Sequence, residues 1–561
     1  MSGTPAFARL RDDVDDGAAD MRRAGADDGD DDDGLSDAAS AEVRAAFEME
    51  LEVQRGEGCA RPCACCNACL PRSARMACAR ATREWGPVAR RQLALALPIS
   101  VTYVSGYGLN LISILFVGRL GAADLAASSL ASMLTNVTGF SVAIGLLTAL
   151  DTLGAQAFGA GNLPRVGYVV QRALLIVTLF IVPVSVLWWF TTPALIALKQ
   201  PPEVAEMSGQ FARLLIPGAA PLLWSEVGKR FLSSQGIVRP MLYVSLLVNA
   251  LHPIWCWLFI YHLELGFAGA AIAMDVSYSL LCLFLAAYIL CFSPHVPGTW
   301  PGWSWREALS GWGEFLKLGV PGAAMLSLEW WAFELCVLVA GALGTASLAA
   351  HNVLATLVVI SFMLPLGQSV AAGTLVGQFL GAGDTRSARK VAAFAVTVGT
   401  AVSTLAATVY VCLGRLVPRA FTDDVGVDDR VTQLLPTVCF FIVLDAVQGI
   451  AQGVLRGAGR QALGAAITIF AYWCISLPAA TVLAHAAGLG LPGLWWGETS
   501  GYIIVVVVYY VVLQRLDWEG ASEVARKRAL ESARGDEKAM LGGDDDGDGA
   551  DDGRVDVELE G

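Results

Sequence analysis

Charged residues are scarce in this sequence. Only 16% of its 561 residues are Asp, Glu, Lys or Arg and only five are His, whereas 55% are hydrophobic. Soluble globular proteins have about 25% charged residues. The composition therefore excludes an ordinary soluble enzyme, a nucleic-acid-binding protein and a disordered scaffold.

The chain also lacks a phosphate-binding loop. Its one Gly-Lys pair is Gly228-Lys229, and the GxxxxGK[ST] motif would require Gly and Ser or Thr where Leu223 and Arg230 stand. ATP-driven transport by this chain is therefore not expected, and an ion gradient is the natural source of energy. We predict no enzyme activity, no bound cofactor and no nucleic-acid partner.

Cysteine is concentrated in one region that lacks the spacing of a metal site. Six of the 13 Cys lie in a short segment: Cys59, Cys63, Cys65, Cys66, Cys69 and Cys78. No pair with zinc-ligand spacing follows downstream and no His is nearby, so no metal site is predicted. We interpret residues 58–87 as a Cys- and Arg-rich juxtamembrane linker, with S-acylation of its cysteines as the alternative.

The net charge of −13 comes from two acidic ends. Residues 1–57 contain 17 acids and 6 bases, and residues 517–561 contain 15 acids and 6 bases, so the body between them has more bases than acids. Asp-rich runs interrupted by Gly and Ala cannot bury enough apolar surface to fold. We predict disordered acidic tails over 1–57 and 516–561.

Apolar stretches long enough to cross a bilayer recur throughout the body. A spanning helix needs roughly 20 mostly apolar residues. The sequence predicts twelve of them, over 92–117, 124–150, 165–192, 206–234, 238–262, 267–292, 314–341, 347–380, 390–417, 431–455, 461–486 and 491–514. The expected fold class is an all-α membrane protein with twelve transmembrane helices, acting as a monomer in the lipid bilayer.

Basic residues are unevenly shared between the predicted loops. With the N-terminus in the cytosol, twenty bases of the body lie on the cytosolic side and six on the other side. This asymmetry is what the positive-inside rule predicts. Because twelve spans return the chain to its starting side, both termini are expected in the cytosol.

The body contains an internal duplication. Phe116–Ser129 (FVGRLGAADLAASS) resembles Val339–Asn352 (VAGALGTASLAAHN), and Thr152–Asn162 (TLGAQAFGAGN) resembles Thr374–Asp384 (TLVGQFLGAGD). Three shorter matches have the same offset, within 222 to 224 residues. So constant an offset over five matches indicates two homologous halves.

The duplication divides the body into two lobes of six spans. We place an N-lobe at 88–292, a cytosolic inter-lobe loop at 293–313 and a C-lobe at 314–515. Six spans return the chain to the same side, so the lobes have one topology and are related by a pseudo-twofold axis along the membrane normal. Secondary transporters built in this way bind their substrate between the halves.

Acids within the predicted spans are few, and an acid inside the membrane is a functional candidate by default. They are Glu226, Asp275, Glu329, Glu334, Asp445 and Glu498. Glu329, Glu334 and Asp445 have Gly or Leu at the corresponding N-lobe positions, so the coupling site is expected in the C-lobe. A protonated carboxyl group tolerates burial and a carboxylate attracts a cation, so alternation between the two exchanges protons for substrate.

Structural roles are the simpler interpretation for the other three acids. Asp275 and Glu498 occupy corresponding positions of the two lobes, and a group present in both fits a structural role. Glu226 lies close to Lys229 and Arg230, which predicts ion pairing.

Glu329 and Glu334 lie in the segment LEWWAFE, five residues apart. On an α-helix they point about 140° apart and cannot share one face. Trp330 and Trp331 beside them offer an aromatic wall to an organic cation, with packing against lipid or another helix as the alternative.

A polar stripe follows one face of the tenth span. Gln448, Gln452 and Arg456 lie three, seven and eleven residues after Asp445. A polar stripe on an apolar helix must face protein or a water-filled cavity. We interpret Asp445 as a functional acid, with an interhelical hydrogen bond as the alternative.

Together these motifs resemble the multidrug and toxic compound extrusion (MATE) transporters of the eukaryotic type. The stretches that resemble the family are TALDTLGAQAFGAGN from Thr148, LEWWAFE from Leu328, QGVLRGAGRQ from Gln452 and GLGLPGLWWG from Gly488. The resemblance covers residues 88–515. It implies alternating access between the lobes and export of cationic or amphipathic organic compounds in exchange for protons, with sodium as the other coupling ion.

The resemblance also assigns residues and a location. It implies a plasma or vacuolar membrane. It implies coupling acids at Glu329, Glu334 and Asp445, and the prediction for the substrate cavity is Asn249, Trp330, Trp331, Asn352 and Gln448. The first span lacks an acid, so no coupling site is expected there. A flippase of lipid-linked or polyanionic substrates and a major-facilitator carrier are the alternatives.

Overall fold

The computed structural model of the chain describes residues 72–419, 421 and 424–541, and this part of the chain forms helices and no strand. The N-terminal half contains α4 (Arg72–Gly118), α5 (Ala122–Thr135), η1 (Asn136–Phe140), α6 (Ser141–Leu146), α7 (Thr148–Gly159), α8 (Leu163–Trp189), α9 (Thr191–Ala197), α10 (Pro202–Leu214), α11 (Ile216–Ser234), α12 (Arg239–Trp257), η2 (Leu258–His262) and α13 (Gly266–Phe292). The remainder contains α14 (Trp305–Leu309), α15 (Trp312–Ala342), α16 (Thr345–Ala382), α17 (Thr385–Leu413), α18 (Leu416–Arg419), α19 (Val425–Gly457), α20 (Gln461–Thr468), η3 (Ile469–Ser476), α21 (Leu477–Thr481), η4 (Val482–Ala486), α22 (Gly490–Arg515) and α23 (Trp518–Leu541).

The membrane-spanning segments agree with the sequence pattern. In the described part of the chain, eleven helical segments are long and apolar enough to cross a membrane, and each coincides with a predicted span. The twelfth prediction, 206–234, is divided at Leu215 between α10 and α11. Its second part contains Glu226, Lys229 and Arg230, which makes it less apolar than the others.

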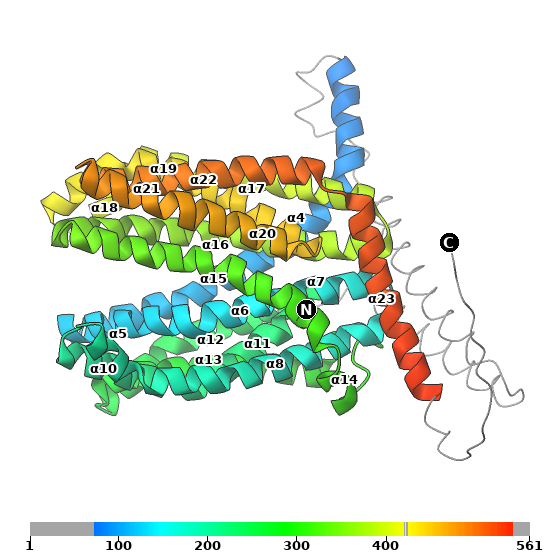
Figure 1. Cartoon of the computed structure of the whole chain (residues 1–561), viewed down its shortest axis with the longest axis horizontal. Helices are drawn as coiled ribbons and strands as arrows, with labels where there is room; N and C mark the ends of the chain where they lie inside the picture. Colours follow the sequence, from blue (N-terminus) through cyan, green and yellow to red (C-terminus); the bar gives the residue numbers. More distant parts are fainter. Residues whose placement is uncertain (1–71, 420, 422–423, 542–561) are drawn as a thin grey trace, which may run out of the picture. The chain divides into compact units, whose positions relative to one another are not determined.

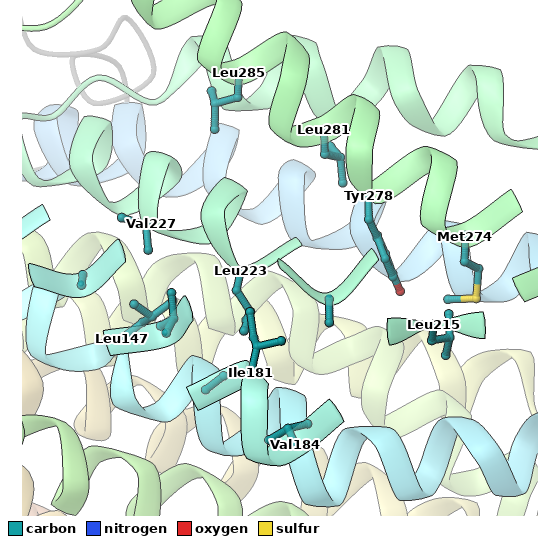
Figure 2. Close-up of a cluster of buried hydrophobic side chains, with 14 of the residues drawn as sticks. Leu147, Ile181, Val184, Leu215, Leu223, Val227, Met274, Tyr278, Leu281 and Leu285 are labelled. Carbon is teal, nitrogen blue, oxygen red and sulfur yellow. The ribbon is translucent and has the colours of Figure 1, made fainter. Parts of the chain in front are cut away.

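Each lobe has its own hydrophobic core. In the N-lobe, side chains of α8, α11 and α13 meet around Ile181, Leu223 and Tyr278, as Figure 2 shows. A second core in the C-lobe contains Phe441 and Tyr502, whose ring centroids are 4.3 Å apart. Two separate cores are what a duplicated six-helix unit predicts.

The first helix of each lobe begins against the other lobe. In the first part of α4, Arg91 Nη2 donates to Gln378 Oε1 at 2.9 Å, and Ser100 Oγ donates to the Leu364 carbonyl at 2.9 Å. Conversely, Phe315 near the start of α15 belongs to the N-lobe core. Both helices therefore cross from one lobe to the other (Figure 1).

The lobes are in close contact where α7 lies against α16 and the end of α19. A Cβ atom added to Gly381 would lie 2.2 Å from the Gln156 carbonyl oxygen, so only glycine allows this approach. Thr152 Oγ1 donates to the Arg456 carbonyl at 2.6 Å, and Gln156 Nε2 donates to the Gly457 carbonyl at 3.0 Å. This seam lies at the end of the lobes predicted to be cytosolic.

The predicted boundaries of the linker and tail need correction. The acidic tail at 1–57 and five of the clustered cysteines lie outside the described residues, whereas 72–87 of the expected linker are the first turns of α4. The prediction of a disordered tail from 516 onward is wrong for Trp518–Leu541, which form α23. The acidic composition led to the prediction of disorder, although the first turns of this helix bury small residues.

The helix α23 contacts both lobes (Figure 1). Ser522 Oγ donates to the Leu380 carbonyl of α16 at 2.8 Å, and Asn162 Nδ2, between α7 and α8, donates to the Ala529 carbonyl at 2.9 Å. Burial lowers the pKa of the Arg528 guanidinium, which lies near Glu314. The helix thus lies across the seam at the predicted cytosolic end.

Candidate functional site

One face of α15 lines a pocket inside the C-lobe. Glu329, Ala332, Phe333 and Cys336 recur at the three- and four-residue spacing that places side chains on one helical face. The cavity between these side chains is small, about 10 Å³. Its lining is completed by Tyr472 and Ser476 of η3, Leu477 of α21, and Glu498 and Tyr502 of α22.

Glu329 is buried, at 4% exposure, and its carboxylate accepts two amide hydrogen bonds. Gln448 Nε2 donates to Glu329 Oε1 at 2.6 Å, and Gln452 Nε2 donates to Glu329 Oε2 at 2.7 Å. None of the ion pairs among the described residues includes Glu329. The carboxylate is therefore held by neutral hydrogen-bond donors, and it feels the charge of Arg456 without forming an ion pair with it.

Asp445 and Glu329 both contact the side-chain amide of Gln448. Gln448 Nε2 also lies 3.3 Å from Asp445 Oδ1, and Gln452 Nε2 donates to Gln448 Oε1 at 2.8 Å. The stripe of Asp445, Gln448, Gln452 and Arg456 is buried along its length. The sequence predicted that this stripe faces protein or a water-filled cavity, and the burial of all four side chains agrees with the first alternative.

A π-helical turn brings an aromatic side chain to the pocket. The segment η3 contains Tyr472, whose ring centroid lies 4.9 Å from that of Tyr502. Phe333 of α15 lies on the other side of Tyr502, with ring centroids 6.1 Å apart. Such turns are frequent at functional sites, and no local signal in the sequence distinguishes this one.

Glu498 lies on the pocket wall, although its correspondence with Asp275 favoured a structural role. It is 3% exposed, and its Oε2 atom has no hydrogen-bond partner in the described part of the chain. The thiol of Cys336 interacts with the same carboxyl group. Repeat symmetry alone therefore gave too little weight to this residue.

Glu334 points away from this pocket. It is half-buried on α15 and is not among the lining residues, which agrees with the angle that separates it from Glu329.

The two neighbouring tryptophans also lie outside the lining. Trp331 Nε1 donates to the Val137 carbonyl of η1 at 3.0 Å, so it joins the two lobes, and Trp330 is partly buried.

The two predicted cavity asparagines are apart from the C-lobe pocket as well. Asn249 of α12 donates through Nδ2 to the Ser105 carbonyl of α4, with a second contact to Ser105 Oγ at 3.2 Å. This is the interhelical bonding that the sequence left as an alternative. Asn352 is exposed on α16. Of the predicted cavity residues, Gln448 alone has a hydrogen bond to Glu329 of the pocket.

The N-lobe acid that was expected to form ion pairs does so. Glu226 Oε1 lies 2.8 Å from Lys229 Nζ, and Glu226 Oε2 lies 2.7 Å from Arg230 Nη1. Arg230 Nε is also 3.2 Å from Asp151 Oδ1. The interpretation of Glu226 as a structural ion-paired residue is confirmed.

Comparison with known sequences finds one family. The sequence model described as MatE matches residues 98–258 and, again, residues 321–482. The two matches begin 223 residues apart, which confirms the duplication inferred from the motifs.

Relatives from animals and plants match most of the chain. Multidrug and toxin extrusion protein 1 of Danio rerio is 36% identical over 437 residues, covering 78% of this chain and 74% of that protein. Protein DETOXIFICATION 12 of Arabidopsis thaliana is 33% identical over 446 residues, covering 78% and 91% respectively.

The fold also matches solved structures. The crystal structure of the eukaryotic MATE transporter AtDTX14 superimposes with a TM-score of 0.76 at 30% sequence identity, over 79% of this chain and 99% of that one. The likeness extends over the two lobes and supports their twelve-helix layout.

Proposed function

Because this chain belongs to the MatE family of multidrug and toxin extrusion transporters, we propose that it exports organic cations in exchange for protons. It is an integral multi-pass membrane protein and a transporter rather than an enzyme. We place both termini in the cytosol, because the bases of the body gather on that side, and the protein in the plasma or vacuolar membrane.

The observation that carries the proposal is the environment of Glu329. Its carboxylate lies inside the C-lobe, accepts hydrogen bonds from Gln448 and Gln452, and takes part in none of the ion pairs among the described residues. An acid in this setting is stable as the neutral acid and, when ionised, attracts a cation. An acid neutralised by a salt bridge would keep one charge state and could not couple transport to protons.

Two amide donors give Glu329 a defined response to a proton. As a carboxylate it accepts from both glutamines, whereas as a carboxylic acid it must donate through one oxygen. Protonation therefore turns one amide to present its oxygen. Since Gln448 also contacts Asp445, the change at Glu329 reaches the second acid through a single side chain.

The pocket lining favours a cationic substrate. Its acidic side chains are Glu329 and Glu498, and its aromatic side chains are Phe333, Tyr472 and Tyr502. Carboxylates and aromatic faces attract organic cations. A polyanionic substrate would require basic residues, and none lines this pocket.

The closed seam supports the alternating-access part of the proposal. The lobes are in contact through α7, α16 and α19 at the end that we assign to the cytosol. We assign the described conformation to the state closed toward the cytosol. Export then requires the seam around Thr152, Gln156 and Gly381 to separate when the protein opens inward.

The proposal is tested with the full-length protein in proteoliposomes. An outward-acidic pH gradient should drive efflux of a fluorescent organic cation, and Glu329→Gln or Asp445→Asn should abolish it. Asp275→Asn, in the N-lobe, is the matched control and should retain efflux. Undiminished efflux in both C-lobe variants would show the assignment to be wrong.

The coupling ion is tested separately. Replacing the pH gradient by an inward sodium gradient at equal pH should give no efflux. Sodium-driven efflux would replace protons by sodium in the proposal and leave the role of the C-lobe pocket intact.

A further inference from the structure

The helix α23 is attached to the C-lobe. Only residues 516–517 separate it from α22. Trp518 and Ala525 of its inner face are buried, and Ser522 Oγ donates to the Leu380 carbonyl near the end of α16 at 2.8 Å. Because of this short connection and these contacts, we expect α23 to move with the C-lobe.

The N-lobe contacts α23 through two side chains where α7 is joined to α8. Asn162 Nδ2 donates to the Ala529 carbonyl at 2.9 Å, and Arg165 Nη1 donates to the Arg528 carbonyl. Arg165 also forms an ion pair with Glu314 through Nη2, at 2.8 Å. When the lobes separate at this end, α23 leaves with the C-lobe, so the hydrogen bonds from Asn162 and Arg165 must break.

The side chain of Arg528 reaches the seam between the lobes. A Cβ atom added to Gly459, between α19 and α20, would lie 2.9 Å from Arg528 Nη1. The same atom would lie 3.6 Å from Gln156 Nε2 and from Thr152 Cγ2, both of α7. The helix α23, the N-lobe and the C-lobe therefore meet around one glycine, at the seam that has to separate when the protein opens toward the cytosol.

The internal repeat isolates the contact between Asn162 and α23. Asn162 and Asp384 occupy corresponding positions of the two lobes, at the ends of FGAGN and LGAGD. Each caps the helix that follows, because Asn162 Oδ1 accepts from the Arg165 backbone N–H at 3.3 Å and Asp384 Oδ1 accepts from the Ser387 backbone N–H at 2.9 Å. Asp caps a helix about as well as Asn does. The side-chain NH₂ of Asn162 is therefore not needed for capping, and it is the group that donates to α23.

We propose that α23 is an autoinhibitory strap, which holds the seam closed on the cytosolic side and must leave the N-lobe before the protein opens inward. The C-lobe carries the strap, and Asn162 and Arg165 of the N-lobe fasten it. The inference rests on the alternating-access part of the proposed function and adds a control on inward opening. This control does not depend on which substrate or coupling ion the protein uses.

Labelling of a thiol buried in the seam tests the strap in the full-length protein. Thr152 is 0% exposed, so Thr152→Cys places a thiol there, and peptide mass spectrometry measures how fast a hydrophilic maleimide reaches it. Asn162→Asp in this background keeps the oxygen that caps α8 and removes the donor to Ala529. It should raise the labelling rate about fivefold, as expected for the loss of one hydrogen bond. Asp384→Asn is the matched control and should leave the rate unchanged, because no hydrogen bond joins Asp384 to α23 among the described residues.

A second pair of variants is measured if Asn162→Asp does not fold. Ala525→Glu, on the buried face of α23, should raise the labelling rate, whereas Val524→Glu, on the exposed face, should not. Equal labelling rates of the two members of the pair that is measured would show that α23 does not hold the seam closed.

A cleavable tether tests whether α23 must leave the N-lobe. Asn162→Cys and Ala529→Cys are joined by a bismaleimide with a disulfide in its spacer, and each single variant receives the same treatment. In proteoliposomes, efflux should be lost in the joined double variant alone and should return after reduction. Full efflux by the joined protein would show that inward opening proceeds with α23 in place and would overturn the inference.

Failure of the proposed function gives a different pattern, because the labelling rates do not depend on transport. If the export proposal is wrong and the strap is right, the unmodified protein shows no proton-driven efflux of the organic cation while Asn162→Asp still raises the labelling rate. Proton-driven efflux together with equal labelling of Asn162→Asp and Asp384→Asn refutes the strap alone.

Discussion

The two lobes share one fold but hold their buried acids differently. In the N-lobe, Glu226 and Asp151 contact Arg230 at 2.7 and 3.2 Å, so their charges are neutralised. In the C-lobe, Glu329 and Asp445 contact only neutral amides in the described contacts. Glu226 and Asp151 thus have fixed charges in the N-lobe, whereas Glu329 and Asp445 of the C-lobe are in none of the ion pairs among the described residues; Asp275 of the N-lobe is outside those ion pairs as well.

Because of this difference, we expect the ion-paired acids to affect the stability of the protein and the amide-bonded acids to affect its transport activity. An acid held by a basic partner contributes to folding, because removal of the partner leaves a buried charge. An acid held by amides has a protonated form that is tolerated in place. Mutations at corresponding depths of the two lobes should therefore fail in different ways.

The largest effect is expected from Arg230→Met in the N-lobe. It leaves Glu226 and Asp151 without their shared partner and should lower the free energy of unfolding by about 3–5 kcal/mol. Denaturant unfolding of the purified protein measures this. Glu329→Gln is the control from the C-lobe. It should lower the free energy of unfolding by less than half as much while abolishing transport. An equal loss of stability in the two variants would contradict the proposed difference between the lobes.

The next effect concerns the seam between the lobes. A Cβ atom added by Gly381→Ala would lie 2.2 Å from the Gln156 carbonyl of the other lobe, whereas one added by Gly373→Ala would meet Gly453 within the C-lobe at 2.7 Å. Both substitutions should cost about 1–3 kcal/mol through overpacking. Only Gly381→Ala should speed hydrogen exchange in peptides that cover 152–162, and equal exchange in the two variants would contradict this.

A smaller effect is expected where α23 contacts both lobes. Ala525 is fully buried and its neighbour Val524 is 44% exposed. Ala525→Glu should detach the helix, at about 1–2 kcal/mol, and make its basic residues cleavable by trypsin, whereas Val524→Glu should leave it protected. Comparable cleavage of the two variants would show that α23 is not held by this face.

The smallest effect is expected from an exposed ion pair of the C-lobe. Arg415 Nη2 lies 3.0 Å from Asp429 Oδ1, and both side chains are more than half exposed. Water screens such a pair, so Arg415→Ala should change the free energy of unfolding by less than about 0.5 kcal/mol. A loss near that of Arg230→Met would mean that burial does not determine how much an ion pair contributes to the stability of this protein.

Much of the candidate site was predictable from the pattern of acids. Glu329 and Asp445 are acids in apolar spans without counterparts in the first repeat, and Gln448 follows Asp445 on the same helical face. The symmetry of the repeat groups Glu498 with Asp275, because the two acids occupy corresponding positions. It could not show that Glu498 lines a pocket, since this depends on the rotation of α22 against α15.

The terminal helix α23 is a second feature that could not be predicted from the sequence. Composition predicted disorder from 516 onward because acids and glycines dominate the end of the chain. The buried residues Trp518, Ala521 and Ala525 mark one face of α23. Their burial depends on a surface formed by two lobes that are distant in the sequence.

The sequence by itself determined the spans, the duplication and the lobe whose acids Glu329 and Asp445 lack counterparts in the other repeat. These follow from hydropathy, repeats and charge, which are local properties of the chain. Only the tertiary structure decided which acids share a pocket. Glu329 and Gln448 are 119 residues apart in the chain, and their contact depends on how α15, α19 and α22 are rotated and where π-helical turns interrupt them. Those rotations result from packing among all the helices of the lobe, which no single segment encodes.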